Sequence, residues 1–147
     1  MEPFDLDLRR VTYRLFVDRQ RPPAADEVAR EAQLDVALVQ EGWRRLHAAH
    51  ALVLDQATGE IRMANPFSAV PTSYRVHAGQ GWWYANCAWD AFGICAALHL
   101  DGRIETACPD CGASLQIDVV DHQPSDETLL FHCLVPARHW WDDIVFT

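Results

Sequence analysis

Cys87 and Asp90 are the residues whose types and spacing most favour chemistry, because a thiol and a carboxyl three residues apart can act on one bound group. They lie in the segment Asn86-Cys87-Ala88-Trp89-Asp90, at the start of an apolar run that predicts a largely buried helix to residue 98. Asn86 is a favoured N-cap residue, which places Cys87 in the first turn. Free backbone N–H groups and the helix dipole favour a thiolate there. Residues at i and i+3 share one helix face, so Asp90 could exchange a proton with a group held by the sulfur.

Three tryptophans, Trp82, Trp83 and Trp89, surround this segment in the sequence and predict an aromatic, water-poor pocket. Such a pocket would raise the pKa of the Asp90 carboxyl by desolvation and leave a protonated acid as donor. A purely structural interpretation stays open, in which Cys87 is a buried thiol at a helix start and Asp90 stabilises the first turn. The aromatic setting favours the chemical interpretation, because a structural turn does not require it.

The other four cysteines suggest either metal binding or packing. Cys108 and Cys111, separated by two residues and followed by a glycine, have the spacing of a zinc knuckle. A closed site needs four ligands, and the remaining candidates, His132 and Cys133, are predicted strand neighbours that point to opposite faces, so one at most can join. The alternative is a pair of reduced thiols at a strand turn. Cys95, in the middle of an apolar helix, and Cys133 are interpreted as small buried hydrophobic residues.

A second unit, residues 73–147, is expected to hold the chemical segment in a small antiparallel sheet flanked by the Cys87 helix. Its predicted strands have apolar or alternating patterns and are separated by turn residues. They cover residues 74–76, 103–106, 114–120 and 129–135. A linker over residues 65–72, which contains two prolines, joins this unit to the preceding one.

The N-terminal unit, residues 1–66, combines helical periodicity with a hairpin, in the order of a winged helix-turn-helix. Its predicted elements are helices over 7–19, 25–32 and from 36 onward, with Asp35 as N-cap, and strands over 52–54 and 61–63. DNA binding through the third helix, with Arg44 and Arg45 on its exposed face, is one interpretation. It is disfavoured because the unit holds nine Arg against eleven Asp and Glu and lacks a basic footprint.

The composition of the 147-residue chain, with 50% hydrophobic residues, suits one compact unit or two small ones. A net charge of -9 disfavours nonspecific binding to nucleic acid. The sequence shows no signal peptide and no apolar stretch that could span a bilayer, so a soluble cytoplasmic protein without membrane contact is expected. Its five cysteines are expected to be reduced. The motifs of phosphate loops, common serine hydrolases and zinc peptidases are missing from the sequence.

The sequence resembles the alkylmercury (organomercurial) lyases, in particular the shorter homologues of that group. The resemblance rests on the helical N-terminal unit, the Asn-Cys-Ala-x-Asp segment at residues 86–90, a further cysteine at Cys108, and the ending from Trp140 to Thr147. It covers essentially the whole chain. The order of these features makes the match more specific than the Cys-Ala-x-Asp spacing alone.

The resemblance implies protonolysis of a carbon–mercury bond, in which two thiolates hold mercury and an aspartate passes a proton to the departing carbon. Cys87 matches the first thiolate and Asp90 the proton donor, and the pairing of mercury with thiolate follows the preference of soft metals. Cys108 matches a family cysteine outside the catalytic pair, so Cys108 and Cys111 are assigned a structural role. The implied partners are an organomercurial substrate and low-molecular-weight thiols. Hg(II) is the product, no cofactor is required, and zinc at Cys108 and Cys111 is a minor alternative.

The second mercury-binding thiol of the family is expected just beyond Thr147. Within the sequence, Cys133, Cys95 or Cys111 could take its place. The sequence therefore predicts an α+β protein with carbon–mercury lyase activity in mercury detoxification. The alternative is a thiol-based metal-binding or sensing module without turnover, contacting a partner or DNA through its N-terminal unit.

Overall fold

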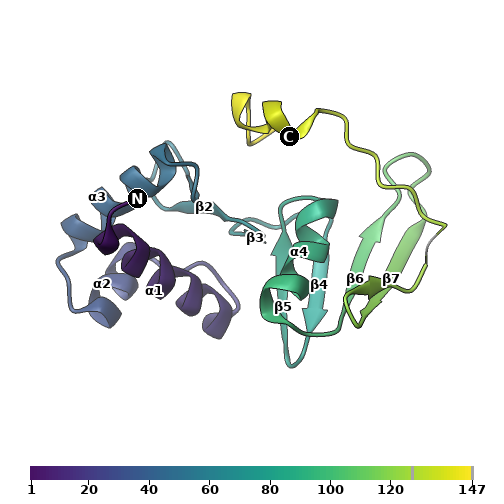
Figure 1. Ribbon diagram of the computed structural model, residues 1–147, viewed down its shortest axis with the longest axis horizontal. Helices are drawn as coiled ribbons and strands as arrows, with labels where there is room; N and C mark the ends of the chain where they lie inside the picture. Colours follow the sequence, from purple (N-terminus) through teal and green to yellow (C-terminus); the bar gives the residue numbers. More distant parts are fainter. Residues whose placement is uncertain (127, 147) are drawn as a thin grey trace.

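The fold, described at residues 1–126 and 128–146 in a computed structural model, confirms the α+β class (Figure 1). Three helices come first, and an antiparallel sheet with one helix packed on it follows. The helices are α1 (Pro3–Arg19), α2 (Ala25–Ala32), α3 (Val36–Ala48), α4 (Ala88–Leu98) and the 3-10 helix η1 (Ala137–Asp142). The strands are β1 (Val53–Leu54), β2 (Ile61–Ala64), β3 (Phe67–Ser68), β4 (Arg75–Ala78), β5 (Gly81–Ala85), β6 (Gly102–Ala107), β7 (Ser114–Val120) and β8 (Gln123–Pro124). Within the described residues, no helix has both the length and the apolar character that crossing a bilayer requires.

The three N-terminal helices pack around a core that contains the fully buried Trp43. Its indole Nε1–H donates to Thr12 Oγ1 at 3.0 Å, and the Thr12 hydroxyl donates to the Leu8 carbonyl at 2.8 Å. The polar atoms of this buried pair are therefore satisfied within the core. Asp35 caps α3 as predicted, because its carboxylate accepts from the Ala37 N–H at 2.8 Å. The winged-helix likeness of the unit stays a prediction.

Arg45, one of the two arginines considered for DNA contacts, is held by the N-terminal helix instead. Its Nη2 donates to the buried carboxylate of Asp5 at 2.8 Å, and its Nη1 lies 3.3 Å from Glu41. The hydrogen bond to Asp5 raises the pKa of Arg45. A guanidinium engaged by two carboxylates is less available to a phosphate. That DNA is a disfavoured partner stays a prediction.

One antiparallel sheet connects the N-terminal hairpin to the C-terminal half, with the strand order β1-β2-β3-β5-β4-β6-β7-β8. The predicted linker contributes β3, which pairs with β2 on one side and β5 on the other. Helix α4 packs on β4, β5 and β6 and buries Ala91 and Ile94 against them. The domain boundary between residues 66 and 73 stays a prediction, but the sheet runs across it without a break.

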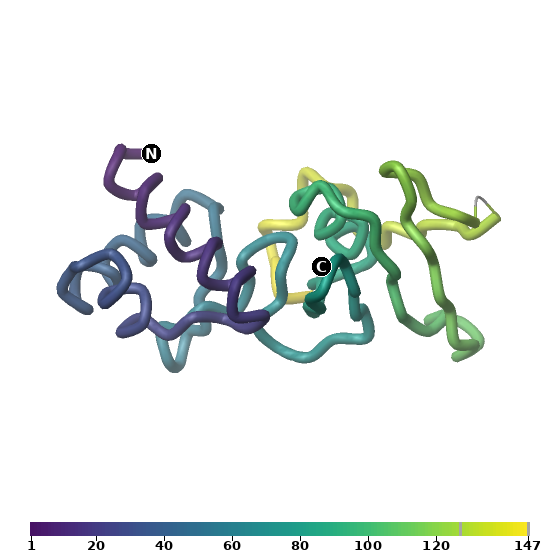
Figure 2. The backbone as a smooth tube through the Cα atoms, turned by 90° about the horizontal axis from the view of Figure 1, so that it is seen from below, coloured from purple at the N-terminus to yellow at the C-terminus, as the bar shows by residue number. Residues whose placement is uncertain are grey.

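Residues 129–135 form no strand, so that prediction is wrong. The outer edge of β7 is taken by β8, and Pro124 in β8 has no N–H to donate to a further strand. The chain leaves the sheet here and runs back across α4 toward the N-terminal helices (Figures 1 and 2). It ends in η1 and a turn, where the ring of Trp141 stacks on that of His50 with centroids 4.1 Å apart. This C-terminal segment, residues 128–146, therefore lies over the start of α4.

Candidate active site

Cys87 lies between β5 and α4 and is itself the residue that caps the helix. The prediction that Asn86 is the N-cap is wrong: Cys87 has the extended backbone of a cap, with φ -153° and ψ -177°, and its carbonyl accepts from the Ala91 N–H at 3.0 Å. A side chain at the cap position lies beside the free N–H groups of the first turn. The sulfur is therefore placed one residue earlier on the helix than expected.

The side chain of Asn86 is used for a different purpose, because it connects the linker to Asp90. Four oxygens surround Asn86 Nδ2: Asp90 Oδ2 at 2.9 Å, Asn65 Oδ1 at 3.2 Å, and the carbonyls of Pro66 and Phe67 at 3.3 Å and 3.4 Å. These contacts hold the Asp90 carboxyl at the start of α4. Burial raises the pKa of that carboxyl, and the hydrogen bond from Asn86 opposes the rise without cancelling it.

Replacement of Asn86 by Ala should destabilise the protein by about 1–3 kcal/mol, because partly buried oxygens of the linker lose their donor. Urea denaturation followed by circular dichroism measures the free energy of unfolding. Gln56→Ala, on an exposed turn, is the control and should change stability by less than about 0.5 kcal/mol. Equal stability of the two variants would contradict a connecting function for Asn86.

The pKa values of Cys87 and Asp90 are both raised, and burial is the largest cause for each. For Cys87, the nearby backbone amide of Asp90 acts in the opposite direction but is outweighed. The helix start therefore favours the thiolate, as expected, but too weakly to offset the burial of the sulfur. For Asp90, the predicted direction of the pKa is confirmed. The site thus pairs a thiol with a carboxyl that burial shifts toward its protonated form.

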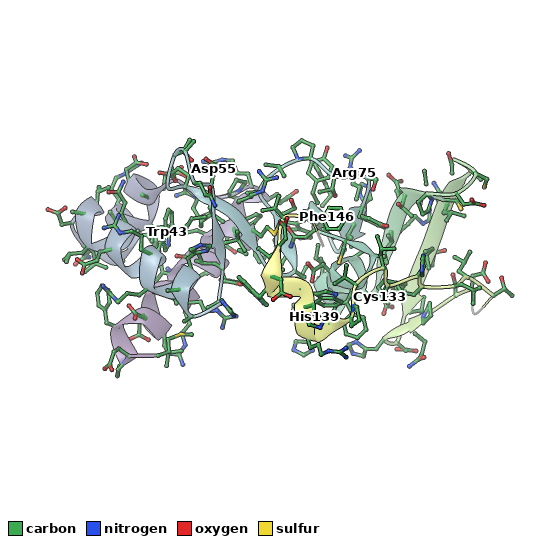
Figure 3. All side chains as sticks on the ribbon, turned by 90° about the horizontal axis from the view of Figure 1, so that it is seen from above. Trp43, Asp55, Arg75, Cys133, His139 and Phe146 are labelled. Atoms are coloured by element: carbon green, nitrogen blue, oxygen red, sulfur yellow. The ribbon has the colours of Figure 1, made fainter. Side chains whose placement is uncertain are left out.

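Two hollows meet at Cys87. The first, of about 180 Å³, is lined by Cys87 and Cys133 and by the aromatic residues Tyr74, Phe131, Trp140 and Phe146. The second, of about 130 Å³, is lined by Cys87 and Asp90 together with Asn86. Trp140 and Phe146 line both hollows, so the C-terminal segment supplies a shared wall. Figure 3 labels Phe146, His139 and Cys133 along this segment.

The predicted tryptophan pocket is not formed, since none of its three members lines either hollow. Trp82 and Trp83 are neighbours on β5, so their side chains point to opposite faces of the strand. Trp83 is buried beside Phe67, and Trp82 lies under the Arg75 guanidinium. Trp89 is 61% exposed. The aromatic walls come instead from Tyr74 and the C-terminal segment, and the density of aromatic residues near the end of the sequence was the signal that could have indicated them.

Cys95 and Cys133 were both predicted to be buried, and the structure confirms this for Cys95 alone. Cys95 is 1% exposed, as predicted. Its Sγ packs closely against Gly102 of β6, since a Cβ added to that glycine would lie 2.7 Å from the sulfur. Cys95 therefore faces the sheet and lines neither hollow. Cys133 was predicted to be buried but is exposed. Its Sγ–H donates to the Val135 carbonyl at 3.0 Å. Of these two candidates for a second thiol, only Cys133 shares a hollow with Cys87.

Cys108 and Cys111 lie in a tight turn between β6 and β7. The Cys108 N–H donates to the Ala113 carbonyl at 2.8 Å, and the Gly112 N–H donates to the Cys108 carbonyl at 2.9 Å. The backbone amide of Cys111 lowers the pKa of the Cys108 thiol. Across the part of the chain that the structure describes, no three His, Cys, Asp or Glu side chains gather as a metal site. Both the structural role and the zinc alternative for this pair stay predictions.

Comparison with known proteins places the chain in a family. A sequence profile described as alkylmercury lyase (MerB) matches residues 67–147, more than half of the chain, including Cys87, Asp90 and Cys133. The fold is similar to that in the crystal structure of the mercury-bound form of MerB2, with a TM-score of 0.67 and 19% sequence identity over 86% of this chain. That match covers 60% of the MerB2 chain, and no curated protein matches the sequence closely. On the evidence of the profile, this chain belongs to the alkylmercury lyase family.

Proposed function

We propose that this protein is an organomercurial lyase, in which Cys87 captures mercury and Asp90 protonates the departing carbon. The observation that carries the proposal is that a thiol and a carboxyl of raised pKa line the same hollow. Membership of the alkylmercury lyase family supports the reaction class. In a reducing cytoplasm, where low-molecular-weight thiols are abundant, this activity would detoxify organomercurials.

The chemistry begins when the Cys87 thiol loses its proton to solvent and its sulfur binds the mercury of an R–Hg⁺ substrate. Thiolate is the softest ligand that a protein offers, and mercury is a soft metal, so capture offsets the cost that burial imposes on the charged sulfur. The carbon–mercury bond then breaks, and its electron pair forms a C–H bond with the proton of Asp90. Mercury remains Hg(II), the hydrocarbon leaves, and Asp90 is left as a carboxylate. Low-molecular-weight thiols remove Hg(II), and Asp90 takes a proton from water.

The hollows are large enough for a small organic group. An apolar protein cavity of about 150 Å³ binds benzene, and the hollows here measure about 180 Å³ and 130 Å³. Their walls are partly aromatic and aliphatic, and the burial of Asp90 there raises the pKa of its carboxyl and so favours the protonated form. Phenylmercury is therefore a suitable test substrate.

The test is to incubate the protein with phenylmercury acetate and excess thiol and to measure benzene by gas chromatography. We expect repeated turnover, with more than one benzene released per chain. Benzene at the level of a protein-free control, with one mercury retained per chain, would reject the lyase. That outcome would favour the thiol-based metal-binding module.

A further inference from the structure

The turn that joins β6 to β7 carries two thiols that lie outside the proposed lyase site (Figure 1). Cys108 is half-buried, Cys111 is exposed, and neither lines a hollow. The Gly112 N–H donates to the Cys108 carbonyl at 2.9 Å, and a hydrogen bond of this span closes one helical turn. Residues three apart in such a turn are neighbours, and the Cys111 thiol donates to the Cys108 sulfur. The fold therefore holds the two thiols side by side.

The backbone of this turn favours the thiolate form of Cys108. The N–H groups of Cys111 and Asp110 and the Cys111 thiol hydrogen-bond to its sulfur, and they lower the pKa of the Cys108 thiol. The Asp110 carboxylate acts in the opposite direction but is outweighed. Thiolate is the nucleophile of thiol–disulfide exchange. Cys108 is therefore the attacking thiol of the pair, and Cys111 is placed to displace whatever becomes bound to it.

The pair is open to small molecules but has too few ligands for a structural metal. Residues 109–114 are all exposed. A Cβ added at Gly112 would meet no atom within 4 Å, so the space beside the turn is open. A structural zinc site needs four ligands, and within residues 1–126 and 128–146 no third His, Cys, Asp or Glu joins the two thiols. An accessible thiolate with a second thiol beside it is instead the arrangement of redox-sensing cysteines.

We propose that Cys108 and Cys111 are a redox-active dithiol, which low-molecular-weight disulfides oxidise reversibly to a Cys108–Cys111 disulfide. The pair and the lyase site use different thiols, so this inference goes beyond the proposed function and does not depend on it. Pro109 fixes one backbone dihedral of the turn, and the Cys108 N–H donates to the Ala113 carbonyl at 2.8 Å. The second thiol is thereby kept near the first, which favours an internal disulfide over a lasting mixed disulfide.

The reaction takes place in two exchanges. The Cys108 thiolate attacks one sulfur of the small disulfide, whose S–S bond breaks, and one small thiolate leaves and takes a proton from solvent. The Cys111 thiol then releases its proton to solvent and attacks the Cys108 sulfur, and the second small thiolate leaves and is protonated in turn. The two cysteines lose two electrons, which the small disulfide gains as it becomes two thiols.

Glutathione disulfide is a suitable probe of the full chain. The reduced protein is incubated with graded ratios of glutathione disulfide to glutathione and quenched with acid, and its free thiols are alkylated. A protease that cleaves after Glu leaves Cys108 and Cys111 together in residues 106–127 and places Cys133 in another fragment. Mass spectrometry should show that fragment 106–127 loses both free thiols together as the ratio rises and regains both in excess glutathione.

Two matched variants assign the roles of the thiols. Cys111→Ser keeps a hydrogen-bond donor at that position but should accumulate a glutathione mixed disulfide at Cys108, with the internal disulfide lost. Cys108→Ser should acquire glutathione at Cys111 more slowly than Cys111→Ser acquires it at Cys108. Both changes lie in an exposed turn, so unchanged thermal melts are expected. Equal rates in the two variants would overturn the assignment of Cys108 as the attacking thiol.

Two results would overturn the redox pair itself. One is a fragment 106–127 that keeps both thiols free while exposed Cys133 becomes glutathionylated. The other is purified protein that holds one zinc per two chains and loses it in Cys111→Ser, because the pair would then be half of a metal site shared by two copies. Benzene release by the reduced protein should be the same with and without these substitutions, so the lyase stands or fails separately.

Discussion

Cys87→Ser should reduce benzene release from phenylmercury by at least about 10³-fold, because loss of a catalytic nucleophile removes the step on which the others depend. A serine hydroxyl is a hard ligand and does not replace thiolate toward mercury. The variant should also retain less mercury per chain than the unaltered protein, which separates loss of capture from loss of proton transfer. Gas chromatography of benzene and elemental analysis of bound mercury measure the two effects.

Cys111→Ser is the matched control for this experiment, because Cys111 is an exposed thiol that lines neither hollow. It should release benzene at close to the rate of the unaltered protein. Were Cys87→Ser to keep that rate too, mercury capture would have to be assigned to another thiol. A loss of activity in both variants to the same extent would point to general thiol reactivity rather than to one site.

Features fixed by near neighbours in the sequence were predictable. The alternation of residues 114–120 predicted β7, and Asp35 was recognised as an N-cap from its place before an apolar periodic run. The spacing of Cys87 and Asp90 predicted that both lie at the start of one helix, although Cys87 is its N-cap and not a residue of its first turn. Each of these inferences depends on contacts within a few residues, where side-chain type and backbone geometry are tightly coupled.

Features that depend on distant contacts were not predictable in the same way. Asn86 has the residue type of a cap, but oxygens of the linker about twenty residues earlier compete for its side chain. Residues 129–135 have the composition of a strand, but a further strand would need an unpaired edge of the sheet. That edge of β7 is occupied by β8, whose Pro124 has no N–H to donate to a next strand. That segment instead brings Cys133 to Cys87. The lining of the first hollow is therefore a product of tertiary structure.

Asp90→Asn should slow benzene release by about 10²–10⁴-fold, the usual contribution of a positioned general acid, while mercury capture by Cys87 persists. The amide has nearly the shape of the carboxyl, and its oxygen can still accept from Asn86 Nδ2, which lies 2.9 Å from Asp90 Oδ2. It has no acidic proton to give. Single-turnover experiments that follow bound phenylmercury and released benzene separate the two steps. A variant with the original rate would show that another group donates the proton.

The same substitution should also stabilise the protein at neutral pH, and the sign follows from the raised pKa of Asp90. A carboxyl whose pKa is higher in the folded state binds its proton more tightly there, so stability falls as pH rises from the ordinary value of about 3.9 through the raised one. Asparagine has no such dependence. Urea denaturation should therefore find Asp90→Asn more stable than the unaltered protein at pH 7, with the difference vanishing below about pH 4. Equal stabilities at pH 7 would contradict a buried carboxyl. A gain in stability together with a loss of turnover would show that Asp90 is kept for the proton it carries, at a cost to the stability of the fold.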